Sequence, residues 1–560
     1  MPTIAPARAL KLLQGLKYDC SSKAAEQKLE LLASLEHGRL SSSQAVYAFH
    51  ELAGYMRAYP ENAEILEVAE RISRQFDARP DLERFRQKLI DTGIAGTAIQ
   101  FRFYWLTAIF LVKRWPENLT IQWKDFEHRA KLSEWLHLLL PFSETAALDS
   151  FEFDPDEWID LLKGPDETDA AFLIERFEAM PAFIQLREKI YEDLDIPMLL
   201  EPGIDTPARG RERWPDSPVV FRDAPPPGGR PNLKREIPKV AFEVDTLDPK
   251  TARKLIDLAN TCMVPRHRDL LIFLYADPHD VRMIDLGDGL QLACMGAVPE
   301  RRLMLESVYG FLTLMNGVPV GYVLCSAFYN SAEVAYNVFE TYRGAAAADT
   351  YCRVLAVVAG LFGVDSFAID PYQLGHNNAE GQNSGAWWFY QKLGFRPHNA
   401  KVRALEREEL ARMKKEPGYR SSPAKLNDMA SEYMFLQLKG RRNDVLGKIS
   451  LGNIGLKVSE YLAQRFGHDR EGGLDTCEAE TAKLLGLPSR SKLARGEHIA
   501  WRRWAPLVLA IPDVAKWTQP QRFALRDVIR AKGGPQEADF VRLLDRHAKL
   551  RTALLELSKD

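Results

Sequence analysis

The most informative side chains lie in one short run, Asn383-Ser384-Gly385-Ala386-Trp387-Trp388-Phe389-Tyr390-Gln391-Lys392-Leu393-Gly394-Phe395. Asn383, Ala386 and Tyr390 recur at offsets of three and four, which places them on one face of a helix. Gly394 is typical of a helix end, and a strand is expected to begin at Phe395. A face that carries an amide and a phenol can meet a cofactor, although a plain amphipathic helix would show the same spacing.

A second run could bind an anion. Residues 333–339 alternate in the manner of a strand, residues 340–344 end in a glycine, and residues 345–348 are four alanines that favour a helix. In a strand, turn and helix of this kind, the unpaired amides of the first helical turn face the loop. The helix dipole then favours an anion such as a pyrophosphate. The alternative is an alanine-rich helix start of ordinary propensity.

Together the two runs resemble motifs of the GNAT superfamily of acyl-CoA-dependent N-acetyltransferases, and they occur in that family's order. The GNAT pyrophosphate loop, R/Q-x-x-G-x-G/A, overlays on Arg343, Ala346 and Ala348. Ala346 departs from it, because glycine there lets a phosphate approach the backbone closely. Glu340 stands where the family usually has proline, and would repel a pyrophosphate unless it faces Arg343 or solvent. The resemblance implies that coenzyme A or acetyl-CoA contacts Val338, Phe339, Arg343, Gly344, Ala345, Ala346, Ala347, Ala348 and Asn383.

The resemblance also implies a reaction in which an amine attacks the acyl-CoA thioester directly. This reaction needs a polarised carbonyl, a base for the amine and an acid for the departing sulfur. Backbone groups of a splayed strand at Val338 and Phe339 would meet the pantetheine arm and the carbonyl. Tyr390 would be the acid, unless it only packs beside Trp387. Glu333 is the first candidate for the base, and an exposed strand carboxylate is the simpler interpretation.

Polar side chains between these motifs are candidates for contacts with the acceptor. Segment 371–382 is longer and more polar than the corresponding connection of many GNAT enzymes, and it begins at the carboxyl end of an expected strand. The candidates are Tyr372, His376, Asn377 and Asn378. His376 is also a second candidate for the base. A surface turn is the competing interpretation. The segment carries a single carboxylate, Glu380, so a small amine or an exposed protein amine fits it better than a polyamine.

The surrounding elements indicate one mixed sheet with helices. Asn316-Gly317 is a strong hairpin signal between strands expected at 309–315 and 320–328. Further strands are expected at 240–244, 281–285, 290–295, 366–369 and 432–438, with helices at 250–260 and 269–275. An insertion at 396–431, with a helix at 404–415, could shape the acceptor pocket or dock the neighbouring domains. We therefore predict a GNAT-like domain at 238–440.

Composition breaks divide the rest of the chain, which at 560 residues is too long for one core. Eight prolines between Pro202 and Pro231 indicate a linker, placed at 201–237. Helical periodicity appears at 24–35, 42–59, 62–76, 81–92, 123–140, 446–466, 477–485 and 519–559. The predicted fold class is multidomain α and α+β. A central GNAT-like mixed sheet with helices is flanked by all-α domains at 1–200 and 441–560, which could bind protein partners.

Charge and cysteine usage exclude several classes of function. The net charge is −3 and no basic stripe alternates with aromatics, so we expect no nucleic-acid partner. The six cysteines show no C-x-x-C spacing, which indicates buried thiols in a reducing, cytoplasmic compartment, and no metal site is assigned. The most apolar segment, 103–112, is too short to span a membrane, so no membrane association is expected.

Two functions of different classes remain open. The first is an acyl-CoA-dependent N-acyltransferase that uses acetyl-CoA on an unknown amine, and Asn383 and Tyr390 favour it. The second is a catalytically silent GNAT-like protein that binds CoA, or nothing, and serves as a scaffold between helical partner-binding modules. Ala346 and the lack of an obvious base favour the second.

Overall fold

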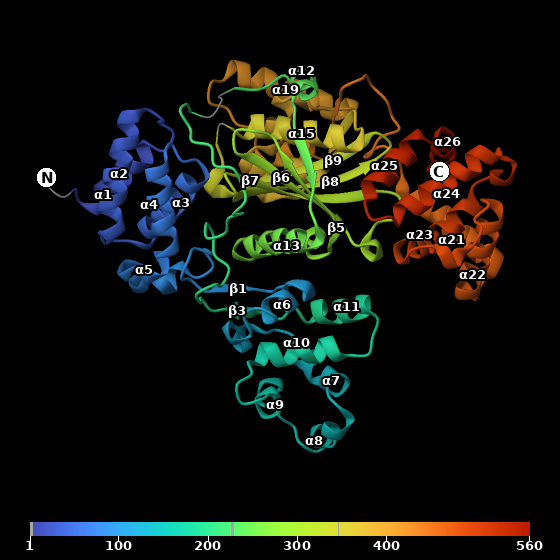
Figure 1. Cartoon of the computed structure of the whole chain (residues 1–560), viewed down its shortest axis with the longest axis horizontal. Helices are drawn as coiled ribbons and strands as arrows, with labels where there is room; N and C mark the ends of the chain where they lie inside the picture. Colours follow the sequence, from blue (N-terminus) through green and yellow to red (C-terminus); the bar gives the residue numbers. More distant parts are fainter. Residues whose placement is uncertain (1–3, 226–228, 345, 560) are drawn as a thin grey trace. The chain divides into compact units, whose positions relative to one another are not determined.

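The computed structural model describes residues 4–225, 229–344 and 346–559 (Figure 1). The chain divides into two compact units. Unit 1 comprises Met1–Pro225, Lys254–Leu274 and Leu314–Pro319. Unit 2 comprises Pro226–Arg253, Tyr275–Thr313 and Val320–Asp560. In this division the sheet and the C-terminal helices belong to the same unit.

Unit 1 is mainly helical, as expected. Side-chain caps from Ser21, Ser42 and Asn62 begin α2, α3 and α4, because each accepts a hydrogen bond from an otherwise unpaired amide of the first turn. The helices of this unit are α1 Pro6–Gly15, α2 Ser22–His37, α3 Ser43–Ala58, α4 Ala63–Arg74, α5 Pro80–Phe85, α6 Trp105–Val112, α7 Arg129–Leu139, α8 Thr145–Ser150, α9 Pro155–Leu162, α10 Asp169–Ala179, α11 Ile184–Leu194 and α14 Leu271–Leu274. Helix α13, Pro249–Met263, runs from unit 2 into unit 1.

The prediction of an all-α N-terminal domain is wrong. The described part of unit 1 contains a small antiparallel sheet of β1 Ile99–Phe101, β2 Leu119–Ile121 and β3 Met198–Leu200, in the order β1-β3-β2. Strands of three residues are too short for a two-residue alternation to stand out in the sequence. Their apolar side chains join the core beneath α6 and α10.

The predicted linker is partly packed onto unit 1. Ala208 and Trp214 are buried, and the backbone N–H of Trp214 donates to the backbone carbonyl of Gly317 at 2.8 Å. Asn316 and Gly317 form the predicted hairpin turn, with φ values of 50° and 79°. The Asn316 amide donates to the carbonyl of Ala58 at 3.0 Å. The turn prediction is confirmed, and the segment around Trp214 packs within unit 1.

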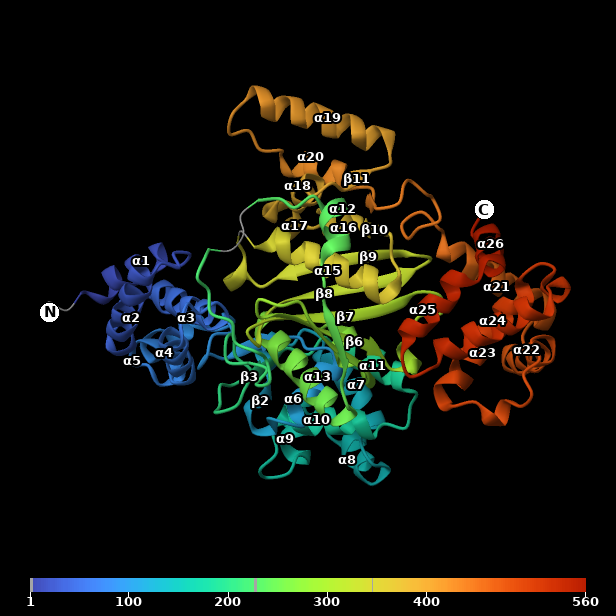
Figure 2. The same ribbon diagram turned by 45° about the horizontal axis from the view of Figure 1, so that its top comes forward.

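Unit 2 is built on a mixed sheet, in which nine strands can be followed in the described residues (Figure 2). Their order is β11-β12-β10-β9-β8-β7-β6-β5-β4. The strands are β4 Glu243–Thr246, β5 Ala276–Asp285, β6 Leu290–Ala297, β7 Ser307–Met315, β8 Val318–Phe328, β9 Ser331–Val338, β10 Ser366–Ile369, β11 Arg396–Pro397 and β12 Met434–Gln437. The predicted strands thus exist with shifted ends, and the mixed helix and sheet character of the prediction is confirmed.

Strands β9 and β10 are parallel and are connected by α15, Ala347–Phe362. Helix α15 lies against one face of the sheet, where Tyr351 stacks on Tyr336 of β9 with ring centroids 5.3 Å apart. The register of the two strands runs from Ser331 opposite Ser366 to Glu333 opposite Ala368. Because β9 continues to Val338, its second half extends past this register.

The expected helix across residues 383–393 is wrong, because two helices meet there. Helix α17, Ala379–Ser384, ends at Gly385, whose φ of 71° lies in the left-handed region, and α18, Ala386–Lys392, begins after it. A glycine in this conformation is the common terminator of a helix. The spacing of three and four residues spans Gly385, although Asn383 belongs to α17 and Ala386 and Tyr390 belong to α18.

The remaining helices of unit 2 follow the sheet. The predicted insertion contains α19 Ala400–Lys415 and α20 Pro423–Met429, and the other helices are α12 Leu233–Glu236, α16 Pro371–Leu374, α21 Leu451–Phe466, α22 Arg470–Leu484, α23 Arg495–Ala510, α24 Gln519–Lys532, α25 Glu537–Arg546 and α26 Ala548–Leu557. The C-terminal part is helical as predicted, whereas α12, α16, α20 and α23 were not predicted.

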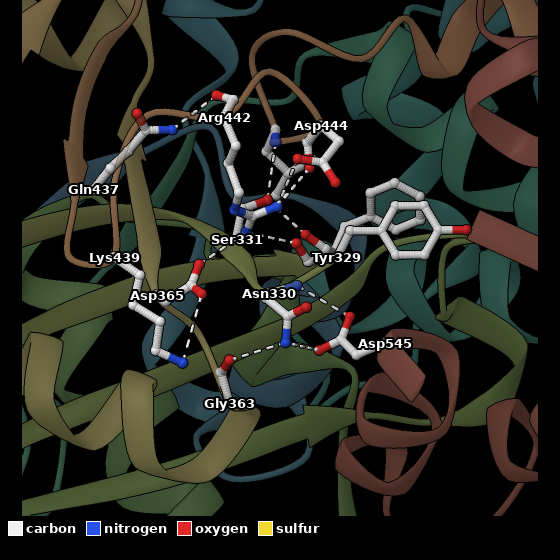
Figure 3. A network of polar contacts seen from close by, with 12 residues as sticks. Tyr329, Asn330, Ser331, Gly363, Asp365, Gln437, Lys439, Arg442, Asp444 and Asp545 are labelled. Carbon is white, nitrogen blue, oxygen red and sulfur yellow. Dashed lines mark hydrogen bonds and ion pairs between the residues drawn. The ribbon is translucent and has the colours of Figure 1, made fainter. Parts of the chain in front are cut away.

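Polar contacts fix the C-terminal helices to the turn between β8 and β9 (Figure 3). The backbone N–H and the side-chain amide of Asn330 each donate to Asp545 of α25 at 3.0 Å. Arg551 of α26 donates to the Asn330 side-chain oxygen at 3.0 Å. Arg442 donates to the carbonyl of Tyr329 at 2.8 Å and to Asp365 at 3.0 Å. The strand that carries Glu333 is therefore anchored at its start.

Candidate functional site

A cavity of about 760 Å³ lies in unit 2 at the N-terminal end of α15. Its wall comes from four segments: the start of α15, the pair α17 and α18, the insertion, and the residues just before α12. Gly344, Ala347, Ala348 and Asn383, all predicted cofactor contacts, line it. The structure therefore brings together parts of both sequence motifs.

The first backbone N–H of α15, that of Ala347, donates to the Gly344 carbonyl at 3.2 Å, so a ligand would meet the amides that follow it. Ala346 is the N-cap residue, and no side chain within the described chain caps this helix. The only acidic residue of the first turn, Asp349, is paired with Arg353 at 3.0 Å. Uncapped amides at a helix start favour an anion. Ala345, another predicted contact, lies outside the described residues.

Three cationic side chains line the same cavity, namely Arg230, Lys392 and Arg420. Burial lowers the pKa of Lys392, and the positive charges of Arg230 and Arg420 lower it further. Across the described residues, no carboxylate forms an ion pair with any of the three, and the cavity wall contains no Asp or Glu. The cavity is therefore positively charged.

These three cations were missed by sequence reasoning. Arg230 belongs to the predicted linker, Arg420 to the insertion, and Lys392 to the last turn of α18, where a cation at a helix C-terminus has an ordinary explanation. The three residues are far apart in the chain, so no local motif connects them. Only the fold places them around one cavity.

Tyr390 contacts β9 at Tyr336, three residues beyond Glu333, where the pairing of β9 with β10 ends. It is 4% exposed, and its ring contacts Tyr351 and Phe395. Burial raises the pKa of Tyr390 well above its usual value, although a hydrogen bond from the backbone N–H of Tyr336 acts in the opposite direction. The hydroxyl therefore keeps its proton across the physiological range and is available as a donor.

The remaining predicted cofactor residues have other partners. The Phe339 N–H donates to the carbonyl of Val320 at 2.9 Å, so this amide is used by the sheet. Arg343 donates to the carbonyl of Val338 at 3.2 Å and pairs with Glu380 at 3.1 Å. Neither Phe339 nor Arg343 belongs to the described cavity wall. Ligand contacts at these residues would require the present hydrogen bonds to be exchanged.

Glu333 lies in an acidic environment that the sequence did not show. The Tyr433 hydroxyl donates to it at 3.4 Å. Burial, followed by the negative charges of Asp370 and Glu306, raises the pKa of Glu333 to about 7. Ser326, opposite Glu333 on β8, donates to Glu306 at 2.9 Å. Glu333 is therefore half-buried, in contrast to a solvated strand carboxylate, and its pKa suits a base near neutral pH.

The predicted acceptor residues mainly hold their own segment together. Asn378 caps α17, where its side-chain oxygen accepts from the Gly381 N–H at 3.1 Å. The Asn377 N–H and the His376 ring both contact Asn427 of α20, at 2.8 and 3.1 Å. Tyr372 is exposed. These contacts favour the surface-turn interpretation, and Gln382 is the residue of segment 371–382 that the described cavity wall contains.

The insertion contributes to the cavity at the start of α15. Met413, Arg420, Ser421, Pro423 and Leu426 all line it. The Trp388 indole N–H donates to the Ser421 hydroxyl at 3.2 Å, which ties the insertion to α18. We expected the insertion to shape the acceptor pocket. Its residues instead line the cavity that contains the predicted cofactor contacts.

Other features of the described residues are quickly stated. All six cysteines lie in the described ranges and are free thiols, five of them buried. The described side chains include no group of three or more His, Cys, Asp or Glu residues arranged to hold a metal ion. Among the described helices, none has both the length and the apolar character needed to cross a membrane.

Comparison with known proteins adds no relative to this description. No protein-family model, no curated protein and no solved structure matches the chain.

Proposed function

We propose that this chain is an acyl-CoA-dependent N-acyltransferase, with acetyl-CoA as the donor and an amine as the acceptor. The observation that carries the proposal is the positively charged cavity at the uncapped start of α15, with Asn383 in its wall. Backbone amides and unpaired cations fit a pyrophosphate. The motif resemblance and the buried Tyr390 beside β9 support the same assignment.

Two side chains have properties suited to the proton transfers. When the amine nitrogen bonds to the thioester carbonyl carbon, the nitrogen loses a proton and the C–S bond breaks. Glu333, with a pKa raised to about 7, can accept the proton from nitrogen. Tyr390 holds a proton that it can give to sulfur. The carboxylates of Glu306 and Asp370 near Glu333 would also attract a cationic amine to this part of the sheet.

A second candidate is a protein that binds CoA without turnover. The observation that favours it is the use of the Phe339 N–H by Val320 and of the Val338 carbonyl by Arg343. An enzyme of the first kind would use backbone groups in this region to polarise the thioester. The two candidates share the cavity and differ in the acceptor chemistry.

Calorimetric titration with CoA and acetyl-CoA, followed by thiol release from acetyl-CoA with a panel of primary amines, separates the candidates. Ala347→Glu should reduce CoA binding by at least about a hundredfold, because it adds bulk and a negative charge beside the uncapped amides. Ala404→Glu, on an exposed part of α19 outside the cavity wall, is the matched control.

Each result has one meaning. CoA binding with thiol release on an amine supports the enzyme. Binding without release on any amine supports the second candidate. Full CoA affinity in Ala347→Glu would show that the cavity has been assigned to the wrong ligand.

A further inference from the structure

The cavity at the start of α15 is divided by chemistry into three parts. Its first part is the uncapped helix start at Ala347. Its second part is an apolar wall of Trp388, Met413 and Leu426. The third is the group of cations formed by Arg230, Lys392 and Arg420, which we name the cationic rim. A helix start can hold a diphosphate without help from three further cations, so the exposed rim is available to a second anionic group of the same ligand.

The cationic rim consists of like charges that repel one another. Arg230 and Arg420 both disfavour the charged form of Lys392. The wall of the cavity carries no carboxylate among its described residues, and Arg230, Lys392 and Arg420 are all exposed, so solvent rather than protein now surrounds their charges. A ligand group with two negative charges would relieve the repulsion and would receive several charge-assisted hydrogen bonds. A phosphomonoester is such a group, and it is present in CoA as the 3′-phosphate.

The rim residues come from three separate segments of the chain that line one cavity. Lys392 lies at the end of α18, Arg420 lies between α19 and α20, and Arg230 lies before α12. The Trp388 to Ser421 hydrogen bond fixes the wall between Lys392 and Arg420. The apolar wall offers the flat indole of Trp388, 8% exposed, and the thioether of Met413 to a purine ring.

We propose that the cationic rim reads the 3′-phosphate of coenzyme A and makes this chain selective for CoA over its 3′-dephosphorylated form. The proposal rests on the proposed function, since it assigns a subsite in the same cavity. It gives the predicted linker and the insertion a common role, because each contributes one arginine to the subsite.

The test compares dissociation constants for CoA, dephospho-CoA and ADP on the full chain by calorimetry. The wild-type protein should bind CoA at least about tenfold more tightly than dephospho-CoA. In Arg420→Gln and in Lys392→Gln the preference should fall to about threefold or less, mainly through weaker CoA binding. Lys415→Gln, an exposed cation at the end of α19 outside the cavity wall, should keep the wild-type preference.

The outcomes separate the two proposals. Equal affinity of the wild-type protein for CoA and dephospho-CoA would overturn the subsite and leave the proposed function intact. Equal losses of both ligands in the rim variants would also overturn it, because the rim would then hold the diphosphate. ADP affinity equal to that of CoA would show that a diphosphate alone is read. If none of the three ligands binds, both proposals fail.

Discussion

At the residue scale, Tyr390 and Tyr351 are neighbouring phenols with different hydroxyl environments. The Tyr390 hydroxyl meets the Tyr336 backbone N–H, whereas the buried Tyr351 hydroxyl has no hydrogen-bond partner within the described residues. Both rings pack in the same aromatic cluster, with centroids 5.7 Å apart. Substitution of each tyrosine by phenylalanine therefore distinguishes the loss of a hydroxyl that is bonded to the β9 backbone from the loss of one that is only packed.

Tyr390→Phe should lower turnover roughly ten- to a thousandfold and leave CoA affinity within about threefold, because an acid acts mainly in the transition state. Steady-state kinetics and calorimetry measure the two quantities. Tyr351→Phe is the matched control, and should change neither. Unchanged turnover in Tyr390→Phe would make Tyr390 a packing residue.

Glu333 should give the protein a pH dependence of both activity and stability. Its folded pKa of about 7 lies above its ordinary value of 4.5. The folded state therefore binds the proton more tightly than the unfolded state, so the contribution to stability is largest below pH 4.5 and is lost as the pH rises to about 7. Activity should change in the opposite sense, because the base must be ionised.

Glu333→Gln should accordingly lose most turnover yet unfold less readily than the wild-type protein at pH 8, by on the order of 1–3 kcal/mol. Urea denaturation at pH 5 and pH 8 measures the difference, which should shrink at the lower pH. Wild-type turnover should rise through about pH 7. A variant with full turnover and an unchanged pH profile would remove Glu333 from the mechanism.

At the element scale, the break between α17 and α18 decides which residues reach the cavity. Asn383 lines the cavity from α17, whereas Tyr390 packs against β9 from α18. A continuous helix would have placed both on one face. Lys392, in the last turn of α18, also lies in the cavity wall.

Gly385→Ala tests this break. A Cβ at Gly385 would meet no atom within 4 Å, so the cost comes from its φ of 71° alone. We expect the variant to lose about 1 kcal/mol of unfolding free energy, and Gly385→Asn to lose less, because asparagine tolerates the left-handed region. Chemical denaturation measures both. A gain of stability in Gly385→Ala would indicate the continuous helix, in which alanine is favoured over glycine.

Sequence patterns predicted the strands and helices with long regular periodicity. The hairpin turn at Asn316 and Gly317 and the strand at 366–369 were found where the pattern placed them. The three-residue strands β1 to β3 were missed because they show too little alternation. Asn378 was interpreted as a ligand contact but caps a helix, which an asparagine before Ala379 could have indicated.

The candidate site was predicted in part for a different reason. Local motifs located Gly344, Ala347, Ala348 and Asn383, which all lie in the cavity wall. Side chains that act from a distance were invisible. Glu306 and Asp370 raise the pKa of Glu333 across strands, and Arg420 reaches the cavity from the insertion. Such contacts depend on the tertiary fold, and the spacing of residues along one sequence does not reveal them.

At the scale of the whole molecule, the C-terminal helices are part of the same compact unit as the sheet. Asp545 of α25 accepts two hydrogen bonds from Asn330 in the turn that begins β9. Arg442 contacts the same turn (Figure 3), and Arg551 of α26 donates to the Asn330 side-chain oxygen. These contacts make the helices a structural support of the strand that carries Glu333, in addition to any partner binding.

Asp545→Ala should lower the unfolding free energy of unit 2 by roughly 1–3 kcal/mol, since two donors of Asn330 lose their acceptor. Differential scanning calorimetry measures the loss. Asp539→Ala, an exposed carboxylate on the same helix, should have an effect close to zero. Equal stability of Asp545→Ala and the wild-type protein would show that the turn is held by Arg442 and Arg551 alone.

The short register between β9 and β10 has a mechanical consequence. In the described ranges, the strands from β4 to β9 and the strands β10 to β12 share a seam of three paired positions. Beyond these three positions, the Tyr336 N–H donates to the Tyr390 hydroxyl, and the Val338 carbonyl accepts a hydrogen bond from Arg343. A ligand with amide groups laid along this stretch would continue the ladder as an added strand. Its binding would add backbone contacts where the two parts of the sheet are not paired, and we expect slower amide hydrogen exchange at Ser366–Ile369 as a result.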